Sequence, residues 1–412
     1  MVQLTTDLSD LPPELLQALS ENIEPSDLLA WRLTCKQLWI TSTRAFGRTH
    51  FTNRRHAFSS HDLGQLVEIT KHAVWGPYVR TVEVSAQIIQ RMGLVLLAER
   101  IAKREPGIHD DEIAMYSHIL EDQTELLEGG KAAELLTRAF NNLRQHSQSK
   151  IELAIAQDMA YKGFSASAWK PHTQEEVDSI EPYLCLQDRS IFITRTMLVA
   201  ASEARLEVAN VFIHERGILL DSFVNTPKAA MSNLRGLKIQ TVKRPLRPQT
   251  IASLAYLFSH AEKLEVFELH ETMIPEASSS VLLNLMCHWN KQPLREMRID
   301  GLFVTPEDLL KWLSCCKGTL RVLHIHHLLL ESSDPTLSEG AWMNSWIEVL
   351  EWIMENLVLT TLHLDGAIPF SVKLDDQETV NARLKELLVS KSQAAQELVD
   401  TDDAEDAPTS TV

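Results

Sequence analysis

The sequence predicts an α/β protein in which a few N-terminal helices precede an irregular solenoid of parallel strands with helices outside. The main observation is a repeated pattern, L-x-x-L-x-[IL] with Val or Met at some positions, that starts at Val79, Leu234, Leu264, Leu294, Leu320 and Leu359. Helical patterns follow the later segments, at 250–260, 277–289, 306–316 and 341–356. A repeated strand and helix can bury their apolar faces only against their neighbours, which favours a parallel sheet with outer helices.

Composition and charge exclude several classes of partner. The chain has 412 residues, of which 44% are hydrophobic and 23% are charged, as is ordinary for globular proteins. Its formal net charge of −17 argues against binding to nucleic acid or to an anionic membrane, because both require basic surface. No apolar run reaches the roughly 20 residues that span a bilayer, and no signal-peptide pattern opens the sequence. We expect no membrane segment and a cytoplasmic or nuclear location, and the five cysteines without a CxxC pair fit a reducing compartment.

The stretch from Leu8 to Phe46 predicts two short helices. The first has one apolar stripe with a spacing of four residues, formed by Leu11, Leu15, Leu19 and Ile23. Its first turn tolerates Pro12 and Pro13, whose missing N–H groups would have no partner there. The chain should bend at Glu24-Pro25, with Ser26 as the N-cap of the second helix.

The second helix is apolar on two sides. One stripe comprises Leu28, Trp31, Cys35 and Leu38, and a second set off that stripe comprises Leu29, Leu33 and Trp39. About forty residues cannot bury that much apolar surface internally. Either the rest of this chain or another protein must cover the remainder.

The segment closely resembles the F-box at Leu11, Pro12, Glu14, Leu15, Leu16, Ile23, Asp27, Leu28, Leu29, Arg32, Leu33, Cys35 and Trp39. It departs from the family at Asn22, where an aromatic residue is frequent. The resemblance implies a three-helix F-box at 8–47 that binds the Skp-type adaptor of an SCF ubiquitin ligase, and through it the cullin scaffold. It places the adaptor-facing positions at Leu11, Pro12, Leu15, Leu16, Leu19, Leu28, Leu29 and Trp39.

Residues 48–78 should connect the two parts of the chain. The stretch 44–55 is basic and has Phe46 and Phe51 interleaved, a pattern that invites a nucleic-acid interpretation. In so acidic a chain we interpret it as a solvated connecting strand with inward-facing Phe side chains. Ser59 or Ser60 can then cap a helix that carries Leu63, Leu66 and Ile69.

The repeat region should extend over 79–365. Two further strands are expected from Lys150 and Leu206, with helical sequence at 110–144 and a flap at 157–188. The repeats resemble leucine-rich repeats, although the positions usually held by Asn or Cys are here Val242, Thr272, Leu302 and Leu328. A C-terminal helix is expected at 376–398 and a disordered acidic tail at 399–412.

No catalytic residue, cofactor or metal is expected, because the sequence has no Gly-rich phosphate loop, GxSxG or HExxH motif. One cluster deserves weighing: His324, His326, His363 and Asp365 alternate along two aligned segments, where same-side residues lie about 6.5 Å apart. Such a set could bind zinc. We interpret it as polar residues on an exposed sheet face, and Cys315-Cys316 as core residues rather than metal ligands.

Strand alternation assigns one side chain in two to the core, as in the pairs Leu237/Ile239, Phe267/Leu269, Met297/Ile299 and Leu323/Ile325. The opposite, open face then carries Glu83, Lys238, Glu268, Arg298, His324 and His363, which we expect to bind a protein substrate. Together with the F-box resemblance this implies a non-catalytic substrate-recognition subunit of an SCF-type ubiquitin ligase. Two alternatives stay open: an F-box scaffold protein without a ligase role, and an enzyme with a site near 157–188 and the histidine cluster.

Overall fold

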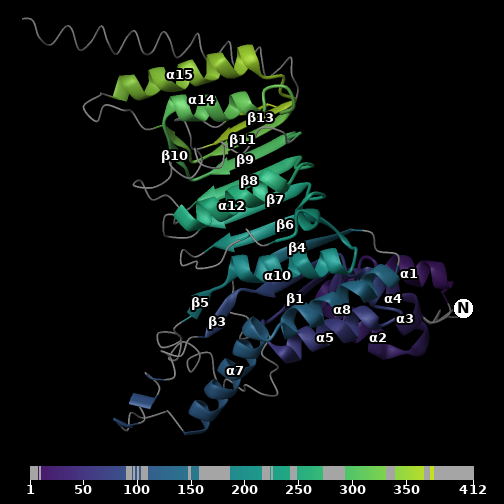
Figure 1. Cartoon of the computed structure of the whole chain (residues 1–412). Coiled ribbons are helices and arrows are strands. Elements are labelled where there is room, and N and C mark those ends of the chain that lie inside the picture. Colours follow the sequence, from purple (N-terminus) through teal and green to yellow (C-terminus); the bar gives the residue numbers. More distant parts are fainter. Residues whose placement is uncertain are drawn as a thin grey trace, which may run out of the picture. The chain divides into compact units, whose positions relative to one another are not determined.

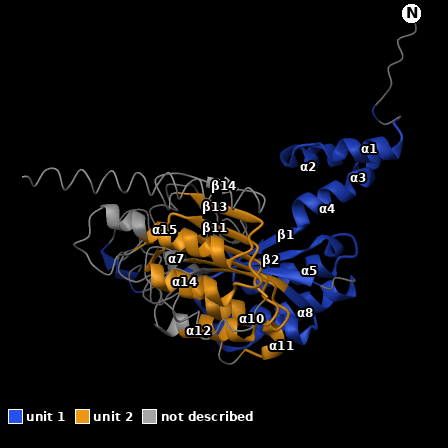
Figure 2. Cartoon of the chain, turned by 90° about the horizontal axis from the view of Figure 1, so that it is seen from above, with its two compact units in different colours: residues 1–187, 196–208 blue, residues 188–195, 209–412 orange. Residues whose placement is uncertain are grey.

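The chain is an α/β protein with N-terminal helices and nine parallel strands accompanied by helices (Figure 1). The computed structural model describes residues 8, 11–89, 95, 98–99, 102–103, 110–146, 150–156, 186–215, 223, 226–241, 248–271, 293–330, 339–365 and 372–374. The chain divides into two compact units (Figure 2). Unit 1 comprises Met1–Gln187 and Thr196–Val208, and unit 2 comprises Asp188–Arg195 and Ala209–Val412.

Four short helices open unit 1: α1 (Pro13–Ser20), α2 (Pro25–Thr34), α3 (Lys36–Thr41) and α4 (Thr43–Phe51). Pro13 and Pro25 are the first residues of α1 and α2, where a missing N–H costs no hydrogen bond. Helix α3 contacts both α1 and α2, and α4 contacts α2. The N-terminal segment is therefore a compact helical group.

Three local expectations for this segment were wrong. Ser26 is not an N-cap, because α2 begins one residue earlier, at Pro25. The predicted second helix is interrupted at Cys35, whose extended backbone (φ −156°, ψ 165°) separates α2 from α3. The basic stretch is mostly helical: it forms α4, and only Asn53–His56 is a strand, β1.

The remainder of unit 1 is a small parallel sheet with helices. Strand β1 pairs with β2 (Thr81–Ser85), and β2 pairs with β4 (Lys150–Ala156). The accompanying elements are α5 (Ser60–Lys71), the 3-10 turn η2 (Gly76–Tyr78), α7 (Asp110–Glu128), α8 (Lys131–Gln145), and the short strands β3 (Gln87–Ile89) and β5 (Leu186–Asp188), which pair with each other. The predicted cap of α5 is confirmed, because the Ser59 hydroxyl accepts a hydrogen bond from the Asp62 N–H at 3.1 Å.

In unit 2 six strands run parallel, and their order in space is their order in the chain (Figure 1). They are β6 (Glu207–Glu215), β7 (Gly236–Thr241), β8 (Val266–Glu271), β9 (Glu296–Asp300), β11 (Val322–His326) and β13 (Thr361–Asp365). Strand β14 (Val372–Leu374) pairs antiparallel with β13, and β10 (Phe303–Val304) pairs with β12 (Leu329–Leu330). The strands of unit 2 thus succeed one another as the repeated pattern predicts.

The helices described beyond α8 are α10 (Ser190–Glu203), α11 (Lys228–Met231), α12 (Pro248–His260), α14 (Pro306–Cys315) and α15 (Glu339–Asn356). The unit boundary passes through α10, a helix that the sequence did not predict, and through β6, whose first two residues belong to unit 1. No helix in the described part of the chain combines the length and the apolar character that crossing a bilayer requires.

The repeated pattern is confirmed as strands. Each of the six segments yields a strand that begins two residues after its first apolar position, and the strands expected from Lys150 and Leu206 are β4 and β6. The helices expected at 250–260, 306–316 and 341–356 correspond to α12, α14 and α15. The expectations for 277–289, 376–398 and 399–412, and for the flap apart from β5, lie outside the described residues.

The core of unit 2 lies between the strands and their helices. All four predicted inward pairs are buried, with exposed fractions of 0 to 1%. Phe267 of β8 makes edge-to-face contacts with Phe258 of α12, at 5.0 Å between ring centroids, and with Trp312 of α14, at 6.2 Å. One face of the sheet is therefore apolar and covered by helices, which leaves the alternate side chains on the opposite face.

Replacing Phe267 by Ala should destabilise unit 2 by about 3 to 5 kcal/mol, because it removes a fully buried ring shared by two helices. Urea unfolding of the variant would measure this loss. The exposed Glu262, in the turn before β8, supplies the control, since Glu262→Ala should change the unfolding free energy by less than about 0.5 kcal/mol. Equal losses for the two variants would contradict this account of the core.

Candidate functional site

The N-terminal helices expose an unusual amount of apolar side chain. Ten large apolar residues are exposed in the described part of the chain, and six of them lie on α1, α2 and α3. We call these six the apolar helical surface: Leu15, Leu19, Leu29, Leu33, Trp39 and Ile40, with exposed fractions from 42 to 77%. Concentrated apolar exposure of this kind marks interaction sites, whereas isolated apolar residues on a surface do not.

The interior of these helices is occupied by other residues. Leu16, Leu28 and Leu38 are buried, with exposed fractions of at most 4%. Arg32 of α2 is buried as well, with an exposed fraction of 4%. With these side chains inside, the small helical group has no room for its second apolar stripe.

Arg32 is held by neutral partners. Its Nη1 donates to the Trp39 carbonyl at 3.1 Å, to the Thr43 hydroxyl at 3.3 Å and to the Ser42 hydroxyl at 3.4 Å. Its guanidinium carbon also lies 4.4 Å from the centre of the Phe46 ring and 5.4 Å from that of Trp75, within cation–π range. Burial lowers the pKa of Arg32 from its ordinary value. The contacts connect α2 with α3 and α4, and they extend to η2 through the neighbouring Trp75.

The eight positions that the F-box resemblance assigns to the adaptor differ in their solvent exposure. Leu15, Leu19, Leu29 and Trp39 lie on the apolar helical surface, Pro12 is exposed at the start of α1, and Leu11 is half-buried. Leu16 and Leu28 are the exceptions, because both are buried and contribute to the core instead of facing solvent. Leu33 was expected in the second apolar set with Leu29 but was not among the adaptor-facing positions, and Ile40 was not predicted as a surface residue.

The second candidate site is the open face of the unit 2 sheet, which we call the polar sheet face. The strand register places Lys238, Glu268, Arg298, His324 and His363 in one row across five strands. A second row, two residues further along each strand, contains Gln240, His270, Asp300, His326 and Asp365. The first row agrees with the predicted alignment of open-face residues, whereas the second row was mostly overlooked, although the same two-residue alternation indicates it.

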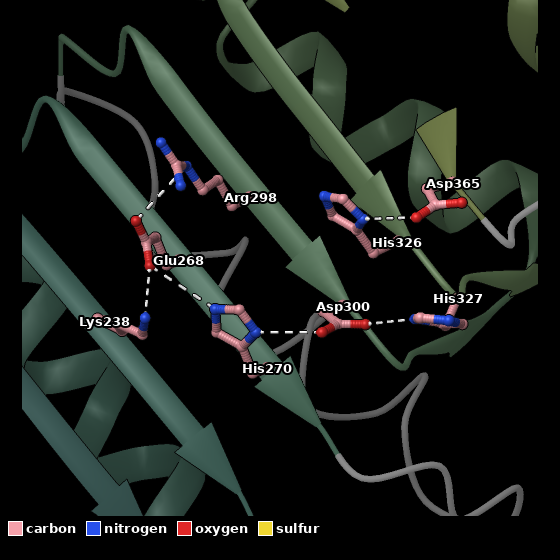
Figure 3. A network of polar contacts seen from close by, with 8 residues as sticks. All are labelled: Lys238, Glu268, His270, Arg298, Asp300, His326, His327 and Asp365. Carbon is pink, nitrogen blue, oxygen red and sulfur yellow. Dashed lines mark hydrogen bonds and ion pairs between the residues drawn. The ribbon is translucent and has the colours of Figure 1, made fainter. Parts of the chain in front are cut away.

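Glu268 is the centre of the ionic contacts on this face (Figure 3). Its carboxylate lies 3.1 Å from Lys238 Nζ, 3.5 Å from Arg298 Nε and 3.6 Å from His270 Nε2. The ion pair with His270, followed by the contacts with Lys238, lowers the pKa of Glu268 to about 2. The same interaction with Glu268 raises the pKa of His270 above its ordinary value.

Asp300 continues the network along the second row. It contacts His270 Nδ1 at 3.2 Å and His327 Nδ1 at 3.0 Å (Figure 3). Arg298 also forms an ion pair with Glu296, at 2.6 Å from Nη2. The face is therefore rich in charges that are already balanced by neighbours, rather than being a field of one sign.

Glu83, the remaining predicted open-face residue, belongs to β2 of unit 1 and forms an ion pair with Arg55 at 2.8 Å. Cys316 is buried, as expected of a core residue, and burial raises the pKa of its thiol to about 12. Cys315 is exposed, contrary to expectation. Neither cysteine adds to a site on the polar sheet face.

His324, His326 and His363 come together on β11 and β13. The rings of His324 and His326 are parallel, with centroids 6.3 Å apart, and the His363 ring is nearly perpendicular to both, at 5.6 Å and 4.7 Å. One ring nitrogen from each lies within 4.8 Å of the other two. Burial is the main cause that lowers the pKa values of His324 and His326 from the ordinary value of a histidine.

Comparison with protein-family models finds no match for this chain, and comparison with curated proteins finds none either. The apolar helical surface and the polar sheet face are therefore the features of the chain from which a function can be inferred.

Acid should destabilise the wild-type protein more than Glu268→Gln. A carboxyl whose folded-state pKa is depressed adds stability above its unfolded value, here near 4.5, and loses it as the pH falls toward about 2. His270 stays protonated throughout this interval, because its pKa is raised from 6.5. The extra loss should be on the order of 1 kcal/mol, measured by urea unfolding at about pH 6 and about pH 3.

The exposed Glu262 is the matched control for this measurement, and Glu262→Gln should retain the wild-type response to acid. If wild type and Glu268→Gln lose stability equally between the two pH values, the carboxylate is not the anchor that its contacts indicate.

Proposed function

We propose that this protein is a substrate-recognition subunit of an SCF-type ubiquitin ligase. In this proposal α1 to α3 act as an F-box that binds a Skp-type adaptor, and the adaptor connects the chain to a cullin scaffold. The protein catalyses no step itself. It would hold a protein substrate close to an activated ubiquitin carried by a partner, so that the reaction gains from proximity.

The observation that carries the proposal is the apolar helical surface. Leu29 and Leu33 lie one turn apart on α2, and Trp39 and Ile40 follow on α3, which contacts α2. Burial of each leucine side chain in an interface is worth about 1.5 to 3 kcal/mol, so a few of them suffice for specific binding. Aromatic residues such as Trp39 are also enriched in the centres of protein interfaces. The surface agrees with the F-box resemblance, with Leu16 and Leu28 reassigned to the core.

Substrate recognition is assigned to the polar sheet face. We propose that the strand and helix repeats of unit 2 form an irregular leucine-rich-repeat-like solenoid, because successive strands pair in chain order and helices alternate with several of them. Solenoids present broad sheet surfaces that bind other proteins. The two rows of balanced charges supply hydrogen-bond donors and acceptors with defined positions, which favours specificity for one partner over general adhesion.

Replacing Leu29 by Glu should weaken binding to a purified Skp-type adaptor at least tenfold, because 1.4 kcal/mol corresponds to a factor of ten. Titration calorimetry of the full-length chain would measure the affinity. The fold should be retained, since Leu29 is about half exposed, and thermal unfolding checks this. Val358 is exposed to a similar degree in unit 2, so Val358→Glu is the matched control and should bind normally.

Two results would contradict the assignment of the adaptor site. One is a wild-type chain that does not bind the adaptor, and the other is a Leu29→Glu variant that binds as tightly as wild type.

Replacing Arg298 by Gln should reduce the set of proteins that co-purify with the chain, while recovery of the adaptor stays constant. The neutral substitution is preferable to a carboxylate, which Glu268 and Glu296 would repel. Arg295 supplies the control, because it is an exposed arginine that precedes β9 and lies outside both rows. Mass spectrometry of complexes from cells that express equal amounts of each variant is the measurement.

An unchanged partner set for Arg298→Gln would remove substrate recognition from the polar sheet face. Partners that depend on Arg298 but are not ubiquitylated by the purified complex would support the alternative of an F-box scaffold without a ligase role.

A further inference from the structure

Three histidines converge on adjacent strands of the polar sheet face. His324 and His326 are two residues apart on β11, so both point to the same side of the sheet, and His363 is the register partner of His324 on β13. All three side chains are half-buried, and their ligand nitrogens lie within 4.8 Å of one another. Regular backbone hydrogen bonding fixes the positions of their Cα atoms, which makes the cluster a consequence of the sheet itself.

The other histidines of this face behave differently. His270 and His327 each contact the carboxylate of Asp300 through ring nitrogen Nδ1. Within the described residues, the ring nitrogens of His324 and His363 have no hydrogen-bond partner, and they face other imidazoles instead. Imidazole rings that face one another without a hydrogen bond between them gain little stability from the contact. A ligand bound by all three rings would stabilise the arrangement.

The local charge also accepts a cation. Two basic residues are register partners of the cluster, Arg298 beside His324 and Lys373 beside His363. The charge of Arg298 is balanced by Glu296 at 2.6 Å and Glu268 at 3.5 Å. Asp365 lies 3.8 Å from His326 Nδ1 and Asp300 is the register partner of His326. These two carboxylates beside His326 favour a divalent cation.

We propose that His324, His326 and His363 bind one divalent ion of the zinc type, with the fourth coordination position open to water. Three imidazoles are a donor set that suits zinc, copper and nickel, and a fourth open position is typical of reactive rather than structural zinc sites. Zn–N bonds of about 2.1 Å place tetrahedral ligand atoms roughly 3.4 Å apart. The three nitrogens already lie within 4.8 Å of one another, so small side-chain rotations would bring them to this spacing.

Asp365 has the position of an orienting group in this site. A histidine ligand usually donates its second ring N–H to a carboxylate, which fixes the tautomer that binds the metal. The Asp365 carboxylate lies on the Nδ1 side of His326, so it would hold the proton there and leave Nε2 for the ion (Figure 3). The sequence alone favoured polar surface residues over a metal site, and the proposal reverses that expectation. It does not depend on the proposed ligase role.

The test is calorimetric titration of Zn²⁺ into the untagged full-length chain after treatment with a chelator. One ion should bind per chain, and His363→Ala should weaken binding at least tenfold. His260→Gln is the matched control, because it removes another half-buried histidine, on α12 and outside the cluster, and it should bind as wild type does. Circular dichroism verifies folding, and the closer replacement His363→Gln serves if the alanine variant is unstable.

Co²⁺ provides a second readout on the wild-type chain itself. A nitrogen- and water-coordinated ion should give visible d–d absorption without the thiolate charge-transfer band that cysteine ligands produce. Absence of zinc binding by wild type, unchanged binding by His363→Ala or His363→Gln, or a thiolate band would each overturn the proposal.

Discussion

The buried guanidinium of Arg32 is the interaction on which the N-terminal helices depend. A charge removed from water must be compensated, and here the Trp39 carbonyl, two hydroxyls and the face of Phe46 do so. These contacts fix α2 against α3 and α4, and they occupy an interior that a few short helices cannot enlarge. Leu29 and Leu33 consequently remain at the surface. The same constraint that holds the helices together thus produces the apolar surface that we assign to an adaptor.

In unit 2 the two-residue alternation of side chains along each strand, together with the constant register between strands, determines which residues face the core and which face solvent. Helices α12 and α14 cover the side with Phe267, so every second side chain of β7 to β13 is left on the polar sheet face. Because the register aligns equivalent positions, charges that are far apart in the sequence become neighbours, as Glu268 and Arg298 do. The polar sheet face, and the histidine cluster on it, follow from the repetition that forms the core.

The repeated pattern predicted the principal strands because each repeat has several buried positions at a fixed spacing. Strands of two to four residues, such as β10 and β12, have too few positions to show a period, and Cys35 interrupts a helix through its own backbone conformation. The apolar pattern of α2 indicated that two faces exist without indicating which is the core. The F-box resemblance placed Leu16 and Leu28 among the adaptor-facing positions, whereas both are buried in the free chain. The contact between His270 and Asp300 depends on strand register, which a single sequence specifies only after the strands are aligned.

The central claim is that α1 to α3 bind an adaptor through side chains that the folded chain leaves exposed. Hydrogen–deuterium exchange of the full-length protein, with and without a purified Skp-type adaptor, tests it most directly. The account predicts slower amide exchange in α1, α2 and α3 when the adaptor is present, and unchanged exchange in β7 to β13 of unit 2. Unchanged exchange in α1 to α3, or protection confined to the strands of unit 2, would contradict it.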